Sequence, residues 1–512
     1  MRDIRFRWRE SHARFAILAC SPTATFRDSP VNTGRLALKT ALSGIARRWL
    51  PAPALGRLVR DGGARRPAPR LMLLTSTLGS GHLRAAQAVE AAFLELSPGS
   101  EVLTLDFWSL MDEGVAQAVR QAYLRLVHER PELYDRIFQL EERTWRRILE
   151  SDESLPPSLA EGIEFLTAAG IGKTLPSPDG GRYAPVDRIL FRLFCAAFRE
   201  PARMGGVSRV RARNALIAWG WTHLAWRLYA RLLAFRPDVV VATQMIPAAL
   251  LSFVKIRRGL ALPAVGVLTD FGMHDFWLQP GIDCHCVAHE SIAGAGNASG
   301  EVARVSATGI PLMPGFRNPP DVREARSRLR LDPDAPVALV LGGGLGLGVD
   351  AIAERVLACP GRLQVLVLAG HNVAARNMLA PLIGRCPGRL YVWDWTEQME
   401  VFFRAADVVV GKPGGLTVAE ALACGRPLLA TRSLRGQEGF NVRFLERHGV
   451  GALVPEEALA QRLRALLANR AELARIQQRA WALGKRDGAA RVAELALELA
   501  RSPSYDQAMQ RR

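Results

Sequence analysis

The sequence predicts an α/β protein with two sheet-forming domains. An apolar run at 71–77 is followed by a glycine-rich turn at 78–82 and then by a helical pattern. A second block opens with an apolar and glycine-rich segment at 335–348. Strand–turn–helix units of this kind build parallel sheets that helices cover. The chain has 512 residues, of which 49% are hydrophobic, so it is too long for one core.

A basic arm precedes the first strand, and we assign it residues 1–69. The net charge of the chain is +18, and +11 of it lies in the first 70 residues. Such an arm is typical of segments that bind nucleic acid or an anionic membrane. Within it, 35–50 has the spacing of a basic amphipathic helix, which either lies on a membrane or packs on the body of the protein. Its apolar face would consist of Leu38, Leu42, Ile45 and Trp49.

The start of the chain lacks the apolar core of a secretory signal, although an Arg-rich start also resembles an organellar transit peptide. We find no apolar run of the length that spans a membrane. The Ala-, Arg-, Leu- and Gly-rich composition favours a bacterial protein. We therefore expect a cytoplasmic protein that is peripheral on the inner face of the plasma membrane.

The first α/β domain is predicted to cover residues 70–310. Residues 112–235 read mostly as helices, with exposed loops between them. The apolar segments that we predict to be strands are 71–77, 101–107, 237–243 and 263–271.

The second α/β domain is predicted to cover 311–500, with a tail at 501–512. The proline-rich segment 308–320 is the expected connector. The domain should close with one long Ala/Leu/Arg helix at about 457–500. Its predicted strands lie in 335–348, 363–370, 390–395, 406–412 and 426–431.

Glycine-rich turns follow the first strand of each domain. Gly79 and Gly81 lie in one, and Gly344 and Gly346 in the other. Ligands of α/β sheets bind at the carboxyl ends of strands, where such turns lie. Neither turn has the Gly-x-Gly-x-x-Gly or Walker A spacing, which argues against dehydrogenases and kinases. His82 follows the first turn; at a helix start its ring should be neutral and able to act as a base, or it makes only a local hydrogen bond.

The segment "KPGGLTVAEALACG", 412–425, allows two interpretations. Thr417 and Glu420 have the spacing of a capping box, which explains both residues structurally. Alternatively, Glu420 accepts hydrogen bonds from ribose hydroxyls, while Gly414 and Gly415 admit a diphosphate to the helix N-terminus. Lys412 would then offset phosphate charge.

Two further clusters are candidates for sites. "CHCVAH", 284–289, contains two cysteines and two histidines, but buried thiols explain it better than a metal, because the usual Cys-x2–4-Cys spacing is missing. Asp270, His274 and Trp277 lie together after a strand. Polar groups beside a large aromatic suit a sugar or lipid headgroup; alternatively, the aromatics only close a cleft.

With these residues placed, the chain resembles the monogalactosyldiacylglycerol synthase and processive diacylglycerol glucosyltransferase group of glycosyltransferase family 28. It is more distantly similar to the peptidoglycan-precursor N-acetylglucosaminyltransferase. The matching motifs run in order over about 71–460 and include "TSTLGSGHLRAAQAVEAAF", "PAVGVLTDFGMHDFWLQPGIDCHCVAHE", "VVGKPGGLTVAEALACGRPLL" and "GQEGFNVRFLERHG". Three features depart from the family: Gln244 stands where a His is expected, 150–216 matches poorly, and the arm has no clear counterpart.

The resemblance implies a GT-B fold, in which two Rossmann-like domains face a cleft, and it implies roles for individual residues. His82 would be the base, or else a residue of the acceptor site. Glu420 would hold the ribose of the donor. The other donor-side residues would be Gly344, Gly346, Lys412, Gly414, Gly415, Thr417, Gln437, Glu438 and Asn441. The acceptor or cleft side would include Gly79, Gly81, Asp270, His274 and Trp277.

We therefore expect an inverting transfer of a hexose from UDP-glucose or UDP-galactose to a membrane lipid hydroxyl, on diacylglycerol or a related glycolipid. By the same resemblance, no metal or cofactor is expected besides the UDP-sugar substrate. A UDP-sugar 2-epimerase shares this fold and is the alternative. A nucleic-acid-binding protein is less favoured, because the positive charge is concentrated in the arm.

Overall fold

The computed structural model describes residues 68–77, 79–138, 161, 188–189, 203–204, 207–273, 277–297, 304–344, 346, 348–431 and 438–502. These residues form two compact units. One consists of the described residues within 108–236 and 253–260, and the other of those within 66–107, 237–252 and 261–502. The predicted amphipathic helix in the arm lies outside the described residues, as do His274 and Gln437.

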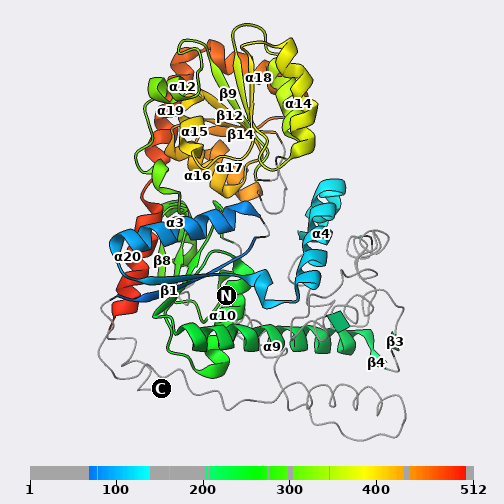
Figure 1. Ribbon diagram of the computed structural model, residues 1–512, viewed down its shortest axis with the longest axis vertical. Helices are drawn as coiled ribbons and strands as arrows, with labels where there is room; N and C mark the ends of the chain where they lie inside the picture. The colour runs from blue at the N-terminus through cyan, green and yellow to red at the C-terminus, as the bar shows by residue number, and fades with distance from the viewer. Residues whose placement is uncertain are drawn as a thin grey trace, which may run out of the picture. The chain divides into compact units, whose positions relative to one another are not determined.

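The larger unit contains both of the large sheets. In its first sheet six described strands run parallel in the order β2-β1-β5-β6-β7-β8. Two of them, β1 and β8, are labelled in Figure 1. The four predicted strands of this region are confirmed, and β7 and β8 are additional short ones. The central strands are buried along their length, as expected where helices cover both faces of a parallel sheet. The strands are β1 (Arg70–Thr75), β2 (Glu101–Asp106), β5 (Val239–Ala242), β6 (Ala264–Val267), β7 (Cys284–Cys286) and β8 (Arg304–Ser306).

The second sheet is also parallel, in the order β11-β10-β9-β12-β13-β14. Each of the five predicted strand segments contains one of its strands, and only β14 was not predicted. The two sheets confirm the predicted class of two Rossmann-like α/β halves. The strands are β9 (Val337–Leu341), β10 (Gln364–Leu368), β11 (Leu390–Trp393), β12 (Val408–Gly411), β13 (Leu428–Ala430) and β14 (Gly451–Leu453).

Helices cover the two sheets. Those that follow strands of the first sheet are α3 (Ser80–Leu96), α10 (Met245–Arg258) and α11 (Glu290–Asn297). A short 3-10 helix, η3 (Pro314–Phe316), and α12 (Val322–Arg328) lead to the second sheet. The helices associated with the second sheet are α13 (Val349–Leu357), α14 (Val373–Arg385), α15 (Met399–Ala405), α16 (Gly415–Ala423) and α17 (Gly439–Arg447).

The predicted single helix at 457–500 is wrong. The structure has a short 3-10 helix, η4 (Glu456–Ala458), followed by α18 (Leu459–Ala468), α19 (Arg470–Leu483) and α20 (Gly488–Arg501). Asn469 starts α19, because its side chain accepts a hydrogen bond from the Glu472 amide at 3.1 Å. After α19, Gly484 packs so closely that a Cβ there would lie 2.5 Å from the Leu422 carbonyl oxygen. This contact requires a glycine where a continuous helix would have placed a side chain.

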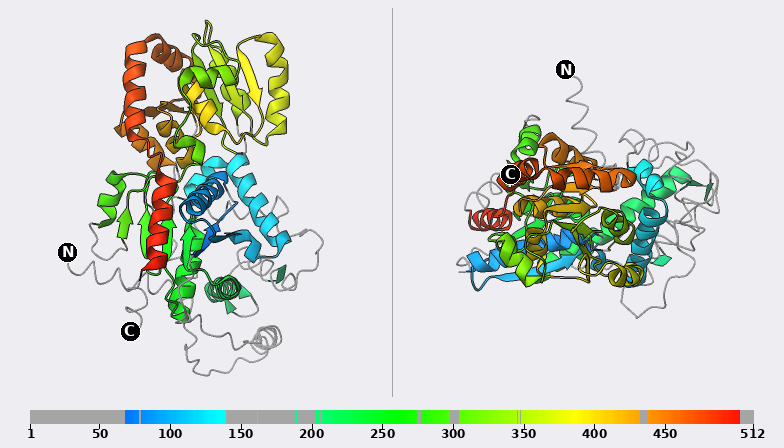
Figure 2. Two further views of the ribbon diagram at one scale, coloured as in Figure 1. Left: turned by 60° about the vertical axis from the view of Figure 1, so that its left-hand side comes forward. Right: turned by 90° about the horizontal axis from the view of Figure 1, so that it is seen from above.

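The last helix returns to the first sheet. α20, red in Figures 1 and 2, packs against α3 and β5. Its buried residues Val492, Leu495 and Ala496 join the core that contains Leu71 of β1 and Val239 of β5. The C-terminal end of the sequence therefore completes the hydrophobic core of the sheet formed near its beginning.

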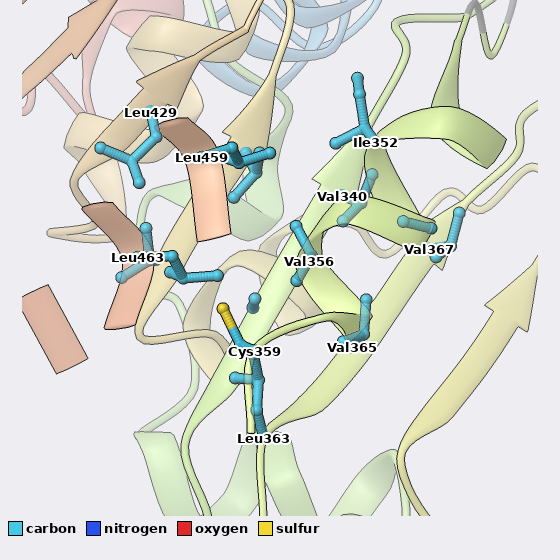
Figure 3. Packing of buried hydrophobic residues seen from close by; sticks show 14 of the residues in the cluster. Val340, Ile352, Val356, Cys359, Leu363, Val365, Val367, Leu429, Leu459 and Leu463 are labelled. Atoms are coloured by element: carbon cyan, nitrogen blue, oxygen red, sulfur yellow. The ribbon is translucent and has the colours of Figure 1, made fainter. Parts of the chain in front are cut away.

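The second sheet has its own core, shown in Figure 3. Val340 and Val365 of the sheet pack with Ile352 of α13 and with Leu459 and Leu463 of α18. Full burial of side chains of this size stabilises the fold by roughly 1.5–3 kcal/mol each. This packing holds the strands, and hence the turns that follow them, in fixed positions.

In the smaller unit the described elements are mostly helices, as predicted for 112–235. They are α4 (Glu113–Glu129), α5 (Pro131–Phe138), α9 (Arg209–Phe235) and the two-residue strands β3 (Arg203–Met204) and β4 (Val207–Ser208). The 3-10 helix η1 (Phe107–Leu110) spans the boundary between the two units. Asp112 caps α4 by accepting a hydrogen bond from the Val115 amide at 3.2 Å. Within the described ranges, no helix is long and apolar enough to cross a bilayer.

Candidate functional site

His82 lies where three neighbouring strands of the first sheet end. It is the third residue of α3, directly after the turn that follows β1. Thr243 follows β5, and Thr269 follows β6 closely. Because β1, β5 and β6 are adjacent and parallel, their carboxyl ends meet at one edge of the sheet. That edge is where α/β sheets bind ligands.

The His82 ring is held through one of its nitrogens. Nδ1 lies 2.9 Å from the Thr243 carbonyl oxygen and 3.0 Å from the Thr269 hydroxyl. A carbonyl oxygen can only accept, so this partner assigns the proton of the neutral ring to Nδ1. Nε2 then carries the lone pair. The surroundings therefore fix the tautomer in which Nε2 can accept a proton.

The predicted neutral state of His82 is confirmed, with a different main cause. Burial lowers the pKa of His82 to about 4, while the hydrogen bond to Thr243 works in the opposite direction. Burial disfavours the charged imidazolium, because the ion loses its hydration. The main cause is thus burial, and not the helix N-terminus that the sequence suggested. The ring is thus neutral over the whole physiological pH range.

The capping box predicted for Thr417 and Glu420 is wrong. The helix α16 begins at Gly415 with Gly414 as its N-cap, and no side chain caps it. Thr417 is therefore its third residue and Glu420 its sixth. The start of the helix is set by close packing of Gly415 on the first sheet, which a local sequence pattern cannot show. Without a capping role, Glu420 needs another explanation.

Gly415 and Gly344 bring the turns of the two sheets together. A Cβ on Gly415 would lie 1.9 Å from the Thr269 carbonyl oxygen, and one on Gly344 would lie 2.7 Å from the Ser80 hydroxyl. Both distances are too short for any side chain, so glycine is required at each position. Thr269 consequently contacts His82 with its hydroxyl and the start of α16 with its carbonyl.

Replacing Gly415 with Ala is expected to destabilise the protein by about 2 kcal/mol or more, because overpacking against the Thr269 backbone must move one of the two turns. Alanine is otherwise the better helix former, so helix propensity alone predicts the opposite sign. Urea unfolding measures the change. Gly414→Ala is the matched control, since its nearest neighbour would be Thr417 Oγ1 at 3.9 Å. Equal stability of the two variants would contradict the close approach.

Asn441 joins the same two regions through its side-chain amide. Its Oδ1 accepts a hydrogen bond from the Phe271 amide at 2.7 Å. Its Nδ2 donates to Asp270 Oδ1 at 2.9 Å and to the Pro413 carbonyl at 3.0 Å. Asn441 is fully buried, and both of its donor hydrogens are used within the protein. In this structure it links the segment after β6 to the turn before α16.

Charged groups surround the start of α16. Lys412 Nζ lies 2.8 Å from Glu438 Oε1. Burial raises the pKa of Asp270, while the hydrogen bond from Asn441 and the charge of Lys412 lower it. An ammonium group beside a helix N-terminus is suited to anionic ligands, since both favour negative charge.

Glu420 is buried on α16, with a side chain that is 8% exposed. Burial raises its pKa from an ordinary value of 4.5 to about 8. The charge of Arg84 lowers the pKa, and that of Glu400 raises it further. A carboxyl group with such a pKa is mostly protonated at neutral pH. Strongly shifted carboxyl groups of this kind are frequent at functional sites.

The other predicted site residues differ in backbone conformation and packing. Gly79 and Gly346 have positive φ angles of 100° and 55°. Gly81 lies beside α16, since a Cβ there would be 3.7 Å from Leu416 Cβ. Trp277 is buried, and its carbonyl oxygen lies 2.8 Å from His285 Nε2.

Gln244, which departs from the family pattern, accepts a hydrogen bond from the Ile246 amide at 2.7 Å and thus supports the start of α10.

Several residues at this edge were not predicted from the sequence: Thr243, Thr269, Arg84, Trp395 and Glu397. The two threonines each come directly after an apolar strand segment, and that position was the available signal. The other three depend on which strands are neighbours. The interpretation of "CHCVAH" as buried thiols is confirmed, because Cys284 and Cys286 are free and buried in β7.

Part of the chain is similar in sequence to known proteins. A family model described as monogalactosyldiacylglycerol (MGDG) synthase matches residues 207–312. A processive diacylglycerol beta-glucosyltransferase of Bacillus subtilis (strain 168) is 29% identical over 247 residues, 48% of this chain and 64% of that protein. One from Bacillus licheniformis is 29% identical over 242 residues, 46% of this chain and 62% of that protein. The chain thus spans less than two thirds of the length of these relatives.

A crystal structure of MurG from Acinetobacter baumannii is 16% identical and has a TM-score of 0.50. The similarity covers 84% of this chain and 100% of that one. At this identity it is evidence for the fold alone. With the two parallel sheets, it confirms the predicted GT-B α/β fold. The chain is therefore similar to the monogalactosyldiacylglycerol synthases and processive diacylglycerol glucosyltransferases, and the resemblance predicted from its motifs is confirmed.

Proposed function

We propose that the protein is a hexosyltransferase that moves a sugar from a UDP-sugar to a membrane lipid hydroxyl, on diacylglycerol or a related glycolipid. One observation carries the proposal. Thr269 contacts the neutral His82 at 3.0 Å, and its carbonyl oxygen packs against Gly415 at the start of α16. A potential base and a potential diphosphate site are thereby joined through a single residue.

In the proposed reaction His82 Nε2 takes the proton of the acceptor hydroxyl. The hydroxyl oxygen bonds to the anomeric carbon while the bond from that carbon to the UDP oxygen breaks. A single displacement of this kind inverts the anomeric configuration. Proton transfer to a positioned base contributes typically 100- to 10,000-fold to a rate. The fixed tautomer supports this role, because Nε2 need not lose a proton first.

The leaving UDP would be stabilised by the start of α16. Backbone N–H groups there and the Lys412 ammonium would receive the negative charge of the diphosphate. Gly414 is not crowded, because a Cβ placed there would have no neighbour nearer than Thr417 Oγ1 at 3.9 Å. Lys412 would exchange its contact with Glu438 for the phosphate. Glu420 would hold the ribose hydroxyls, and Thr417, Gly344, Gly346, Glu438 and Gln437 would complete the donor side.

The acceptor would approach from the first sheet, near Gly79, Gly81, Asp270 and the segment that contains His274 and Trp277. We propose 70–310 as the acceptor and membrane-facing domain and 311–500 as the donor domain, except that its last helix, α20, packs in the core of the first sheet. The basic arm, 1–69, would attract the protein to anionic lipid on the cytoplasmic side of the membrane. The interaction of basic residues with such lipids contributes about 1 kcal/mol per Lys or Arg near the surface.

The test uses purified protein with UDP-glucose or UDP-galactose, with and without vesicles that contain diacylglycerol. Release of UDP should require the vesicles, and the faster donor identifies the sugar. Proton NMR of the purified glycolipid should show a β-anomeric linkage formed from the α-linked donor. An α-linkage would refute the inverting mechanism. UDP release at the same rate with and without the vesicles would refute a lipid acceptor.

A further inference from the structure

Arg84 connects the helix of His82 to the second sheet. It lies on α3 two residues after His82, and its side chain is 12% exposed. Its Nη1 lies 2.6 Å from Glu397 Oε2 and 3.2 Å from Gln87 Oε1. Glu397 belongs to the segment that follows β11, so the ion pair joins two elements far apart in sequence.

Glu397 in turn fixes Trp395. The Trp395 indole nitrogen donates to Glu397 Oε1 at 2.9 Å, while Arg84 takes the other carboxylate oxygen. The Arg84 guanidinium lies 5.8 Å from the centre of the Trp395 ring. His371 stacks on the same indole, with ring centres 4.9 Å apart and planes 11° apart. The two carboxylate oxygens of Glu397 therefore bind Arg84 and Trp395. These three residues and His371 form one assembly.

This assembly borders the proposed donor site at two points. A Cβ on Gly344 would lie 3.6 Å from Trp395 Cζ3, so the indole packs against the glycine turn that follows β9. The positive charge of Arg84 also lowers the pKa of Glu420, against the larger effect of burial. Arg84 thus acts on the glycine turn through Glu397 and Trp395, and on Glu420 through its charge.

We propose that Arg84 is a donor-site positioning residue, which holds the Trp395 segment against Gly344 through its ion pair with Glu397. The inference rests on the proposed function, because it assumes that the donor binds at this edge of the second sheet. Arg84 touches no reacting atom in this account. It aligns the donor site with the helix that carries His82.

An ordinary surface ion pair would contribute little, and Glu397 is 65% exposed. The chain offers a matched pair for comparison. Arg317 Nη1 lies 3.0 Å from Glu95 Oε1, and Glu95 also lies on α3. Both side chains of that pair are well exposed. Removing it tests what an ion pair of α3 contributes in general.

Calorimetric titration of the full-length protein with UDP tests the inference. Arg84→Gln and Glu397→Gln should each weaken UDP binding about tenfold, and the double variant should be weakened no further, because coupled residues are not additive. Glu95→Gln should bind UDP as the unchanged protein does. All four variants should have midpoints of thermal unfolding similar to that of the unchanged protein, which separates positioning from loss of fold.

The pH dependence of UDP affinity gives a second test, because a purely structural role of Arg84 would not change its midpoint. If ionised Glu420 accepts the ribose hydroxyls, UDP affinity rises as the pH passes the pKa of Glu420. Loss of the Arg84 charge raises that pKa, so in Arg84→Gln the rise should move to higher pH. In Glu95→Gln it should stay in place.

The outcomes distinguish the two claims. The positioning role would be overturned if Arg84→Gln bound UDP within twofold of the unchanged protein. It would also be overturned if Glu95→Gln lost as much UDP affinity as Arg84→Gln. Either result would leave the proposed function intact. Absence of UDP binding by the unchanged protein would overturn the proposed function and the positioning role together.

Discussion

His82→Ala is expected to lower the turnover of sugar transfer by about 100-fold or more, while UDP affinity changes less than about twofold. The imidazole is the group proposed to take the acceptor proton, and its described hydrogen bonds are to the first sheet, at Thr243 and Thr269. Initial rates with saturating donor and lipid give the turnover. Titration with UDP gives the affinity in the same preparation.

His82→Asn separates the base from the local structure. An asparagine amide can still donate a hydrogen bond to the Thr243 carbonyl, but it cannot accept a proton. The same loss of turnover is therefore expected with a normal midpoint of thermal unfolding. Turnover close to normal in this variant would remove His82 as the base.

The low pKa of His82 also determines the pH profile. The folded-state pKa of about 4 lies below the ordinary value of 6.5, so Nε2 stays free to accept a proton from neutral pH down to about pH 5. Transfer should therefore lose no rate to protonation of His82 until the pH approaches 4. A rate that halves near pH 6.5 would show that the imidazole is less buried than the structure indicates.

Glu420→Gln is expected to weaken UDP-sugar binding at least tenfold at about pH 8.5, where much of Glu420 is ionised in the parent protein. A carboxylate accepts two strong hydrogen bonds from adjacent hydroxyls, whereas a neutral amide forms weaker ones. The start of α16 does not use this side chain, so the helix should remain intact. Binding of UDP-sugar and thermal unfolding are measured side by side.

The same variant has a second expected effect, on the pH dependence of stability. Glu420 has a folded-state pKa of about 8, above its ordinary value of 4.5, so the folded protein retains a proton that the unfolded chain releases. Its presence therefore lowers the free energy of unfolding as the pH rises from about 4.5 to 8. Glu420→Gln removes this loss and should be more stable than the parent protein at pH 9, by a few kcal/mol.

At pH 5 the free energies of unfolding of the two proteins should differ much less. Glu420 is then protonated in the folded state, so both proteins bury a neutral side chain at this position. His82 acts in the opposite sense, because its lowered pKa costs stability as the pH falls from 6.5 to 4, but it is common to both proteins. Urea unfolding at the two pH values gives the comparison. A constant difference between the proteins would contradict the raised pKa of Glu420.

The sequence predicted the strand–turn–helix units well, because continuous apolar runs and glycine turns are local patterns. It did not predict where α16 begins. That start depends on the contact of Gly415 with Thr269, residues that follow strands of different sheets. The capping box was locally plausible, and a tertiary contact overrode it.

The site shows the same division between local and tertiary information. His82, Glu420 and Lys412 were found because each lies in or next to a glycine-rich turn. Their partners were not found, because the contacts depend on strand order. Thr243 and Thr269 meet His82 only because β1, β5 and β6 are neighbours. Likewise, the packing of α20 on the first sheet could not be predicted, because the sequence does not show which of the two cores its apolar face joins.

The transfer of label between phases shows whether the protein glycosylates a lipid. The protein is incubated with a UDP-sugar labelled in its hexose and with diacylglycerol vesicles, and the mixture is extracted with organic solvent. Label is expected to enter the organic phase with the parent protein, and about 100-fold more slowly with His82→Asn. Label that stays in the aqueous phase on an altered nucleotide sugar would contradict the proposed transfer to lipid, and would identify an epimerase instead.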